Sequence, residues 1–232
     1  GYTDNKGNIK GSDFFFFFTR LNSDLKLLRN LDMGLNITFT RNERTMQDDG
    51  YNFYSSPTWL AKIKSPFLSP YTFTSSGMIT TDLDDSDEFG IGNPTAIIAN
   101  SLNGLKKYRF NIGVKPTYRI NREFTLSNQF DYNLHKAIER KFIPMTGTAV
   151  RMIEGWGESQ NEISSQVMRN TSFFDETRLT FEKKLTAVDH LKAVLGIRYL
   201  YNYYESDYAE EHNTGSDNNT TITGAYKYLQ VR

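Results

Sequence analysis

The sequence predicts an all-β protein, an antiparallel transmembrane β-barrel segment of six or seven strands. Its long segments alternate apolar and polar residues with the period of two that a strand requires. Within each pair of segments a very short turn joins the strands, whereas the connections between pairs are long and polar. Short turns at one rim and long loops at the other are typical of bacterial outer-membrane barrels.

Strand length separates this interpretation from its alternative, a large soluble β-sheet. A tilted membrane strand needs roughly 9 to 11 residues to cross the hydrocarbon, whereas strands of globular proteins usually have about 5 or 6. The alternating segments here exceed both lengths. A soluble sandwich would also place turn residues roughly every 8 to 12 positions. Segment length therefore favours a membrane wall.

The first hairpin is expected over about residues 14–43, with its turn at residues 28–30. One side carries Phe15, Phe17, Leu21, Leu25, Leu27, Leu31, Met33, Leu35, Ile37 and Phe39, and the other carries Arg20, Asn22, Asp24, Lys26, Asp32, Asn36, Thr38 and Asn42. The run Phe14 to Phe18 would be an aggregation hazard as a free segment. In a membrane wall we expect its odd-numbered members to face lipid and its even-numbered members to contact a plug or a neighbouring loop.

Two further hairpins repeat the pattern, over about residues 105–141 and 172–207. Long extracellular loops are expected over about residues 44–104, 142–171 and 205–221, and a seventh strand near Ile222. The apolar sides carry Tyr108, Phe110, Ile112, Val114, Phe130, Tyr132, Leu134, Phe173, Leu179, Phe181, Leu191, Leu195, Ile197, Tyr199, Tyr201 and Tyr203. We interpret the tyrosines at the end of this series as part of an interfacial aromatic girdle, with a substrate platform as the alternative.

The composition is compatible with a barrel but does not by itself decide the class. The formal net charge is +0, from 27 basic and 27 acidic residues, and the mean hydropathy is -0.56. The sequence contains no run of about 18 apolar residues, which excludes a helical membrane span. With 0 cysteines there is no disulfide framework and no thiolate metal site. Six or seven strands cannot close a bacterial barrel, so we expect the chain to be a piece of a larger wall.

Four stretches resemble one family of outer-membrane proteins. They read FFFFFTRLNSDLKLLRNLDMGLNITFTRNE, then SPFLSPYTF and GIGNPTAIIANSLNG within a long loop, then KKYRFNIGVKPTYRINREFTLSNQFDYN. The loop segment contains Asn93-Pro94 ahead of the second hairpin. This succession is similar to the barrel of the SusC/RagA family of TonB-linked outer-membrane transporters, most clearly from about Phe14 to Arg140.

The resemblance implies a barrel of about 22 strands with a plugged lumen, in the outer membrane of a Gram-negative bacterium of the Bacteroidetes type. It implies import of glycans or peptides, energy from TonB, and a SusD-like surface lipoprotein as partner. The plug domain, the TonB box and a carboxypeptidase-like extension are absent from this sequence, so we expect it to supply wall, loops and part of a cavity. The alternative is a soluble or surface β-rich protein that binds glycans or is structural.

An acidic stretch offers oxygen ligands for calcium at Asp82, Asp84, Asp85 and Asp87. An EF-hand loop requires glycine at its sixth position and glutamate at its twelfth. Counted from Asp82, those positions hold Asp87 and Asn93. A solvated acidic loop is therefore favoured, and calcium stays as a minor alternative.

Two tryptophans, Trp59 and Trp156, are the candidates for contact with substrate or with a lid. An exposed indole can stack on a sugar ring or anchor a protein interface, and the alternative is an indole packed inside its own loop. The three histidines, His135, His190 and His212, lack any metal-ligand spacing. No GxSxG, HExxH or P-loop motif occurs. The sequence therefore predicts no enzyme, no metal or other cofactor beyond that calcium alternative, and no nucleic-acid partner.

Overall fold

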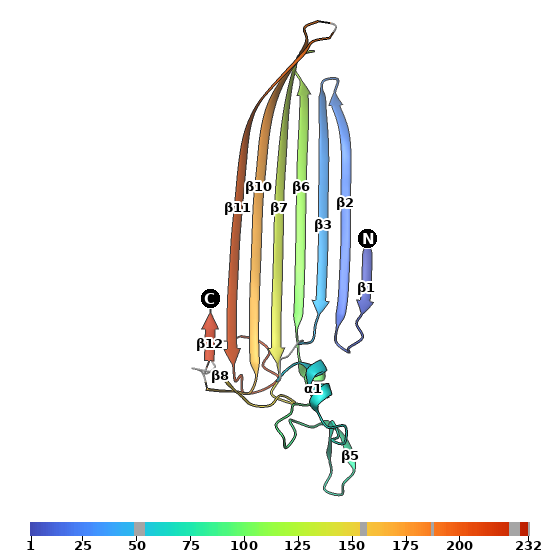
Figure 1. The fold of residues 1–232 in the computed structure, drawn as a ribbon, viewed down its shortest axis with the longest axis vertical. Helices are drawn as coiled ribbons and strands as arrows, with labels where there is room; N and C mark the ends of the chain where they lie inside the picture. The colour runs from blue at the N-terminus through green and yellow to red at the C-terminus, as the bar shows by residue number, and fades with distance from the viewer. Residues whose placement is uncertain (49–53, 154–156, 187, 223–227, 232) are drawn as a thin grey trace.

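One large antiparallel sheet dominates the computed structural model, which describes all residues except 49–53, 154–156, 187, 223–227 and 232. Its eight strands lie in the order of the sequence, β1-β2-β3-β6-β7-β10-β11-β12 (Figure 1). They are β1 (Tyr2–Lys6), β2 (Asp13–Leu28), β3 (Leu31–Thr45), β6 (Gly104–Arg119), β7 (Phe124–Ile143), β10 (Glu162–Lys184), β11 (His190–His212) and β12 (Tyr228–Val231). Every neighbouring pair is antiparallel. This confirms the expected all-β fold with six long strands, to which the structure adds the short strand β1. A seventh strand was expected near Ile222, and the structure has the short strand β12 from Tyr228.

The two ends of the sheet differ, as the lengths of the connections indicated. Short turns join β2 to β3, β6 to β7 and β10 to β11 at the upper end in Figure 1, here called the turn end. The longer connections lie at the lower end, here called the loop end. The third hairpin reaches further toward the loop end than expected, because β10 begins at Glu162 and not near residue 172, and β11 extends to His212. Residues 162–171 are therefore strand, not loop.

The register sorts the side chains of the sheet into two chemically different faces. Residues that pair across neighbouring strands point to the same side of a sheet. On the apolar face one row contains Leu21, Ile37, Ile112, Tyr132, Phe173 and Tyr201, and the next row toward the loop end contains Thr19, Phe39, Phe110, Leu134, Thr171 and Tyr203. Between these rows on the polar face lie Arg20, Thr38, Asn111, Asn133, Ser172 and Asn202. The alternation seen in the sequence thus becomes one apolar and one polar surface.

The apolar face carries a band of limited height. On β11 the band runs from Ala193 to Tyr203. The next row toward the loop end contains Phe17, Arg41, Tyr108, Lys136, Arg169 and Glu205. The ladder of β10 and β11 continues through this row to Glu162 and His212. The strands therefore extend beyond the apolar band at the loop end.

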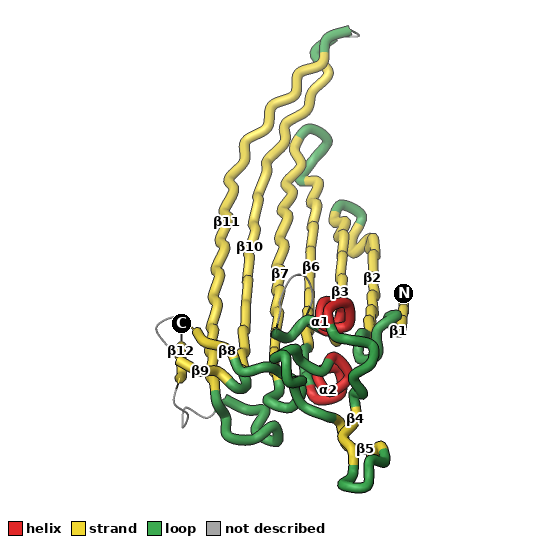
Figure 2. The backbone as a smooth tube through the Cα atoms, turned by 60° about the horizontal axis from the view of Figure 1, so that its bottom comes forward, coloured by secondary structure: helices red, strands yellow, loops and turns green. Residues whose placement is uncertain are grey.

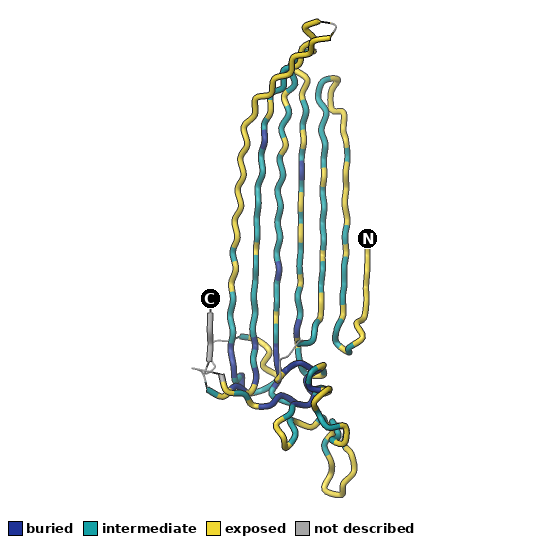
Figure 3. The backbone as a smooth tube through the Cα atoms, in the orientation of Figure 1, coloured by how far each residue is buried: buried dark blue, intermediate teal, exposed yellow. Residues whose placement is uncertain are grey.

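Neither face of the sheet is covered by other parts of the described chain. On β11, Leu195 and Ile197 are 75% and 74% exposed. Buried residues concentrate at the loop end, whereas the sheet is mostly exposed or half-buried (Figure 3). The buried apolar residues are Leu60, Ala96, Ile97, Ala137, Phe142, Ile143, Ala149 and Ile163. The long strands therefore lack a dry core of their own, unlike the layers of a soluble β-protein.

The phenylalanine run alternates between the two faces. Phe17 packs near Phe39 on the apolar face, with ring centroids 6.3 Å apart. Phe14 and Phe16 stack on the polar face at 6.4 Å, and the guanidinium of Arg44 lies 5.1 Å from the centre of the Phe14 ring. The Phe14 ring is thus partly covered by an arginine of the neighbouring strand.

A small polar group interrupts the apolar face. Asp175 pairs across the sheet with Phe130 and Tyr199, so its carboxylate lies within the apolar band. The side-chain amide of Asn128 donates to both Asp175 oxygens, at 3.3 and 3.1 Å, and to Thr177 Oγ1 at 2.9 Å. A polar group away from water is costly unless it is hydrogen-bonded. This cluster, here called the polar notch, meets that requirement internally.

The connection between β3 and β6 forms a compact cap at the loop end. It contains α1 (Pro57–Ile63), β4 (Tyr71–Phe73), β5 (Ile79–Leu83) and α2 (Pro94–Asn100), and a second small hairpin is formed by β8 (Arg151–Ile153) and β9 (Gly157–Ser159). Figure 2 shows both helices at this end of the sheet, where they contact each other. Each helix starts with a side-chain cap and a proline, from Ser56 and Pro57 or from Asn93 and Pro94. No described helix is long and apolar enough to cross a membrane.

Asn93 holds the cap together. Its side chain is 0% exposed and donates to the carbonyls of Pro70 and Asp84 at 2.8 and 2.7 Å. Its amide oxygen accepts from Thr95 N at 3.1 Å, and its backbone N–H donates to the Gly147 carbonyl at 2.7 Å. Gly147 has φ +85, and a Cβ there would lie 2.5 Å from the Cβ of Ala96. The cap therefore depends on one amide and on one close backbone approach.

Candidate functional site

The polar face of the sheet offers the most extensive set of groups that can bind a ligand. One row crosses four strands as Asn22, Asn36, Gly113 and Asp131. The next row toward the turn end contains Asp24, Gly34, Lys115, Gln129, Glu176 and Arg198. Their even spacing follows from the pleat, which places every second residue on this side. The first half of these two rows surrounds a shallow hollow.

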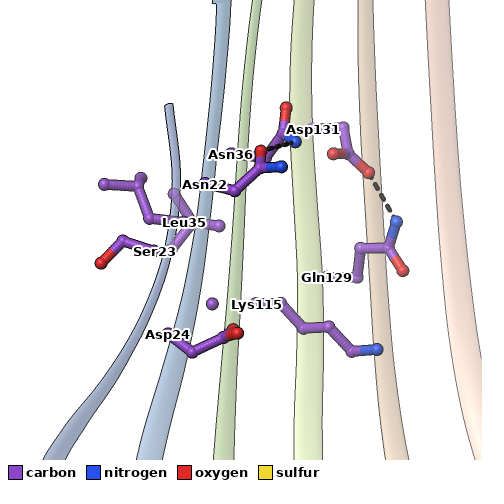
Figure 4. Close-up of a pocket in the computed structure, with 11 residues that line it drawn as sticks. Asn22, Ser23, Asp24, Leu35, Asn36, Lys115, Gln129 and Asp131 are labelled. Carbon is purple, nitrogen blue, oxygen red and sulfur yellow. Dashed lines mark hydrogen bonds between the residues drawn. The ribbon is translucent and has the colours of Figure 1, made fainter. Parts of the chain in front are cut away.

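The hollow has a volume of about 330 Å³ and lies over β2, β3, β6 and β7 (Figure 4). Two glycines sit on its floor, Gly34 and Gly113. A Cβ at Gly113 would come within 2.5 Å of Asp131 Oδ1, whereas Gly34 has only ordinary contacts. The glycines leave the polar side chains around them room above the backbone.

Hydrogen bonds hold four of the amide and charged side chains around the hollow and leave two charged side chains available. Asn36 donates from Nδ2 to Asn22 Oδ1 at 2.6 Å, and Gln129 donates from Nε2 to Asp131 Oδ2 at 2.8 Å (Figure 4). Among the described residues, the Asp24 carboxylate and the Lys115 ammonium group form no hydrogen bond or ion pair. The hollow therefore presents one free carboxylate, one free ammonium group and three hydrogen-bonded side-chain amides to a solute.

An ion-paired group continues the same row. Glu176 accepts from Arg178 Nε at 2.6 Å and from an Arg198 terminal nitrogen at 3.1 Å. Arg198 also lies over the Phe174 ring, 5.6 Å from its centre. Two arginines on one glutamate leave a net positive charge on this part of the polar face.

At the loop end, charged side chains near the ends of the strands form a network. Glu162 pairs with Lys141, 3.3 Å between Nζ and Oε1, and with Arg151. His212, directly opposite Glu162 in the ladder, interacts through Nε2 with Glu210 Oε1 at 2.8 Å. Burial alone would raise the pKa of Glu162, but the positive charges of Lys141 and Arg151 outweigh it and hold this pKa below its ordinary value. The network lies beyond the apolar band.

One ligand atom each from Glu162, Glu210 and His212 lie within 4.8 Å of one another. Such a trio can in principle hold a metal ion. Here Lys141 and Arg151 already neutralise Glu162, and the Tyr208 hydroxyl donates to Glu210 at 2.6 Å. The geometry is that of a satisfied ion-pair network.

The same network contains a serine beside a histidine. Ser159 Oγ lies 3.0 Å from His212 Nδ1. A nucleophile must be reachable by its substrate, but Ser159 is 2% exposed and its hydroxyl donates to the Asn161 carbonyl at 3.2 Å. The contact stabilises the rim of the sheet.

The four aspartates considered for calcium act separately in the cap. Asp85 accepts from the Gly147 amide at 2.8 Å, and Asp87 pairs with the part-buried Lys64 at 3.4 Å. Asp84 accepts from the next backbone amide, and the exposed Asp82 belongs to β5. Within the described chain, no three of these carboxylates come together as metal ligands. The structure uses Asp84, Asp85 and Asp87 to shape the loop.

Of the two tryptophans, the structure describes Trp59 but not Trp156. Trp59 lies in α1, where its backbone N–H donates to the capping hydroxyl of Ser56 at 3.3 Å and its side chain is half-buried. Trp156 lies outside the described residues. The prediction that either contacts a substrate or a lid stays a prediction.

Sequence reasoning missed the hollow and the rim network because both are assembled across strands. Asp24 and Lys115 lie on different hairpins, and Glu162 lies far along the chain from His212. The only local signal was Glu210 two positions before His212, which places both on one face of a strand.

Comparisons with known proteins bear on the fold. No protein-family model and no curated protein matches this sequence. Among solved structures, the RagAB peptide importer in the closed-closed state matches with a TM-score of 0.63 at 16% identity, covering 100% of this chain and 26% of that one. The RagAB peptide transporter matches with 0.63 at 14% identity, and the open-open state of the importer with 0.63 at 15%. The chain thus spans about a quarter of the length of these chains. It has the fold of one stretch of a β-barrel transporter.

Proposed function

We propose that this chain forms part of the wall of a TonB-dependent outer-membrane transporter that imports peptides or glycans. One observation carries the proposal: a sheet of six long strands has one uncovered apolar face and one uncovered polar face. Lipid would cover the apolar face, and water or a plug would cover the polar face. The apolar band on β11, from Ala193 to Tyr203, fits a tilted membrane strand, which needs roughly 9 to 11 residues.

The polar hollow supports peptides as the cargo class. A peptide carries amide groups and both signs of charge, and the hollow offers the free carboxylate of Asp24, the free ammonium of Lys115 and three hydrogen-bonded side-chain amides. Two of the matching structures are states of the RagAB peptide importer, and the third is the RagAB peptide transporter. By analogy we propose a surface lipoprotein of the SusD type as partner, a plug contributed by another part of the protein, and a Bacteroidetes-type outer membrane as location.

Charge insertion tests the orientation of the wall. In the full-length protein, Ile197→Lys would put an ammonium group on the lipid side near the middle of the band, at a cost of roughly 2 to 4 kcal/mol. The matched control Asn202→Lys places the same charge on the polar face of the same strand. We expect the fraction of protein that folds into phospholipid vesicles to fall sharply for the first variant only. This fraction is measured as the amount of protein that resists proteolysis. Equal effects, or a stable water-soluble monomer of wild-type protein without detergent, would favour the soluble β-rich alternative.

A second experiment addresses the cargo. Asp24→Asn and Lys115→Gln remove the free charges of the hollow without changing side-chain size much. If peptides are the cargo, uptake of zwitterionic peptides by cells carrying the variants should fall more than uptake of neutral oligosaccharides. An unchanged peptide uptake in both variants would remove the hollow from the transport path.

A further inference from the structure

Between the hollow and the loop end, the polar face carries a second set of groups that can bind a ligand. Arg109 on β6 pairs in the register with His135 on β7, and His135 pairs with Asn170 on β10. Direct neighbours on one face of an antiparallel pair have Cβ atoms about 4.5 to 5.5 Å apart. Arg109, His135 and Asn170, here called the polar triad, therefore lie side by side on three adjacent strands.

Two atoms of the polar triad are shielded from solvent without a hydrogen bond. They are His135 Nε2 and Asn170 Oδ1, and neither has a partner in the described structure. Both residues are half-buried, and no other element covers this face of the sheet. The two atoms are therefore shielded only by neighbouring side chains, which can move aside. Since a buried polar atom without a partner is costly, a ligand that bonds to both atoms would be favoured.

Arg109 has no acidic neighbour. Its side chain is exposed, and among the described residues it forms no hydrogen bond or ion pair. On this face the nearest carboxylates in the register are Asp131 and Glu139, each four residues away or about 13 Å along the strands. Glu139 is instead a diagonal neighbour of Lys107, which also faces this side. The direct and diagonal neighbours of Arg109 are Thr38, Thr40, Asn42, Asn133, His135 and Ala137.

This combination of groups suits the C-terminal end of a peptide. The guanidinium fork of Arg109 matches a carboxylate, to which it can donate two parallel hydrogen bonds. His135 can donate a further bond when its proton is on Nε2, and Asn170 Oδ1 can accept from an N–H. The carboxylate and the backbone N–H of one residue lie about 3 Å apart, less than the strand spacing of about 4.8 Å. Neighbouring members of the triad can therefore bind both groups of one terminal residue.

The polar triad and the hollow lie along one line of β6. Lys115, at the hollow, is six residues from Arg109 toward the turn end, or about 20 Å. An extended peptide held at the triad would cover that distance with about six residues. Its terminal carboxylate and its other groups would thus contact different parts of the polar face.

We infer that the polar triad binds the free C-terminal carboxylate of a peptide cargo. Arg109 is the anchoring cation, His135 the second donor, and Asn170 the acceptor for the last backbone N–H. This role rests on the proposed function, because it requires the polar face to line the path of a peptide. It adds a preference for one chemical end of the cargo and a binding site separate from the hollow.

The test uses full-length protein purified in detergent micelles. It is mixed with N-acetylated decapeptides of random sequence without Asp or Glu, half of them free acids and half C-terminal amides, and the retained peptides are counted by mass spectrometry. We expect free acids to be retained roughly 10- to 100-fold more than amides, because hydrogen bonds to a charged group are strong. Arg109→Gln should abolish this preference, and Arg109→Lys should keep part of it. The control Lys106→Gln removes a cation from the opposite face of the same strand, where it pairs with Glu43, and should keep the full preference.

Three results would overturn the inference. One is equal retention of acids and amides by wild type, a result that needs no variant to fold. Another is a full preference in Arg109→Gln, which would place the carboxylate elsewhere. The third is stronger displacement of the free acids by inorganic phosphate than by N-acetylglycine, which would mean a site for simple anions. In each case retained peptides would leave the proposed function standing, whereas equal effects of Ile197→Lys and Asn202→Lys would contradict that function itself.

Discussion

The six long strands and the cap at their loop end are stabilised in different ways. The strands are joined by long ladders such as that of β10 and β11, but within the apolar band they bury almost no side chain, and Ile197 is 74% exposed. The cap is small but contains buried groups such as Leu60, Ile97 and Asn93. The difference indicates that the cap carries its own core, whereas the wall needs lipid on one side and other protein or water on the other.

The largest effect is expected from Asn93→Ala in the cap. The change removes three side-chain hydrogen bonds and leaves the carbonyls of Pro70 and Asp84 without their donor in a buried place. We expect a loss of roughly 3 to 5 kcal/mol in the local free energy of opening, measured by hydrogen exchange across residues 54–103. Thr95→Ala, at an exposed position of the same helix, is the control. If hydrogen exchange in the cap of Asn93→Ala is as slow as in wild type, the cap does not depend on these buried contacts.

Gly147→Ala should come next. Its Cβ would meet the Cβ of Ala96 at 2.5 Å, and its φ of +85 already disfavours a side chain. Gly77→Ala has a similar φ of +80 but nothing within 4 Å, so the pair separates close packing from backbone strain. We expect about 2 to 4 kcal/mol for Gly147 and about 1 kcal/mol for Gly77, from protease sensitivity of the cap. Equal costs would show that the approach to α2 contributes nothing.

Variants of the polar notch test whether an unpaired polar group away from water also destabilises the wall. Asn128→Val removes the donor of Asp175, with an expected cost of roughly 1 to 3 kcal/mol in the stability of the barrel in vesicles. The double variant Asn128→Val/Asp175→Val should recover most of it, because both partners are then apolar. Asn111→Val on the polar face is the control. If the double variant is as unstable as the single one, the notch has a role beyond satisfying its own bonds.

The smallest effect is expected at the rim, where Glu162 pairs with Lys141 and Arg151. Its pKa is lowered in the folded state, so its ion pairs stabilise at pH values above the ordinary value of 4.5 and are lost as the pH falls through the lowered value. The protection of residues 157–163 from hydrogen exchange, measured relative to the intrinsic exchange rate at each pH, should therefore fall in acid. In Glu162→Gln this pH dependence should disappear, and its persistence would assign it to another group.

The difference between the apolar band and the loop end also explains which parts of the fold could be predicted from the sequence. Alternation in the band identified the strands and their faces, because lipid or water contact acts on each residue separately. It failed for residues 162–171, where the outer side of the strand changes from Thr171 to the charged Arg169 while the ladder continues. Without an apolar side there is no alternation in hydropathy to detect. The short strand β1 was missed for the same reason, since its side chains are exposed throughout.

The sequence by itself determined the wall: strand positions in the apolar band, the two faces and the short turns, because a period of two is a local property of the chain. Only the tertiary structure decided what the register assembles. It placed Asp24 near Lys115 around one hollow, joined Glu162 to His212 at the rim, and gave Asn93 its partners in the cap. These contacts join residues that are far apart in the chain. Their distances are set by the pairing of strands, which cannot be inferred from a local sequence pattern.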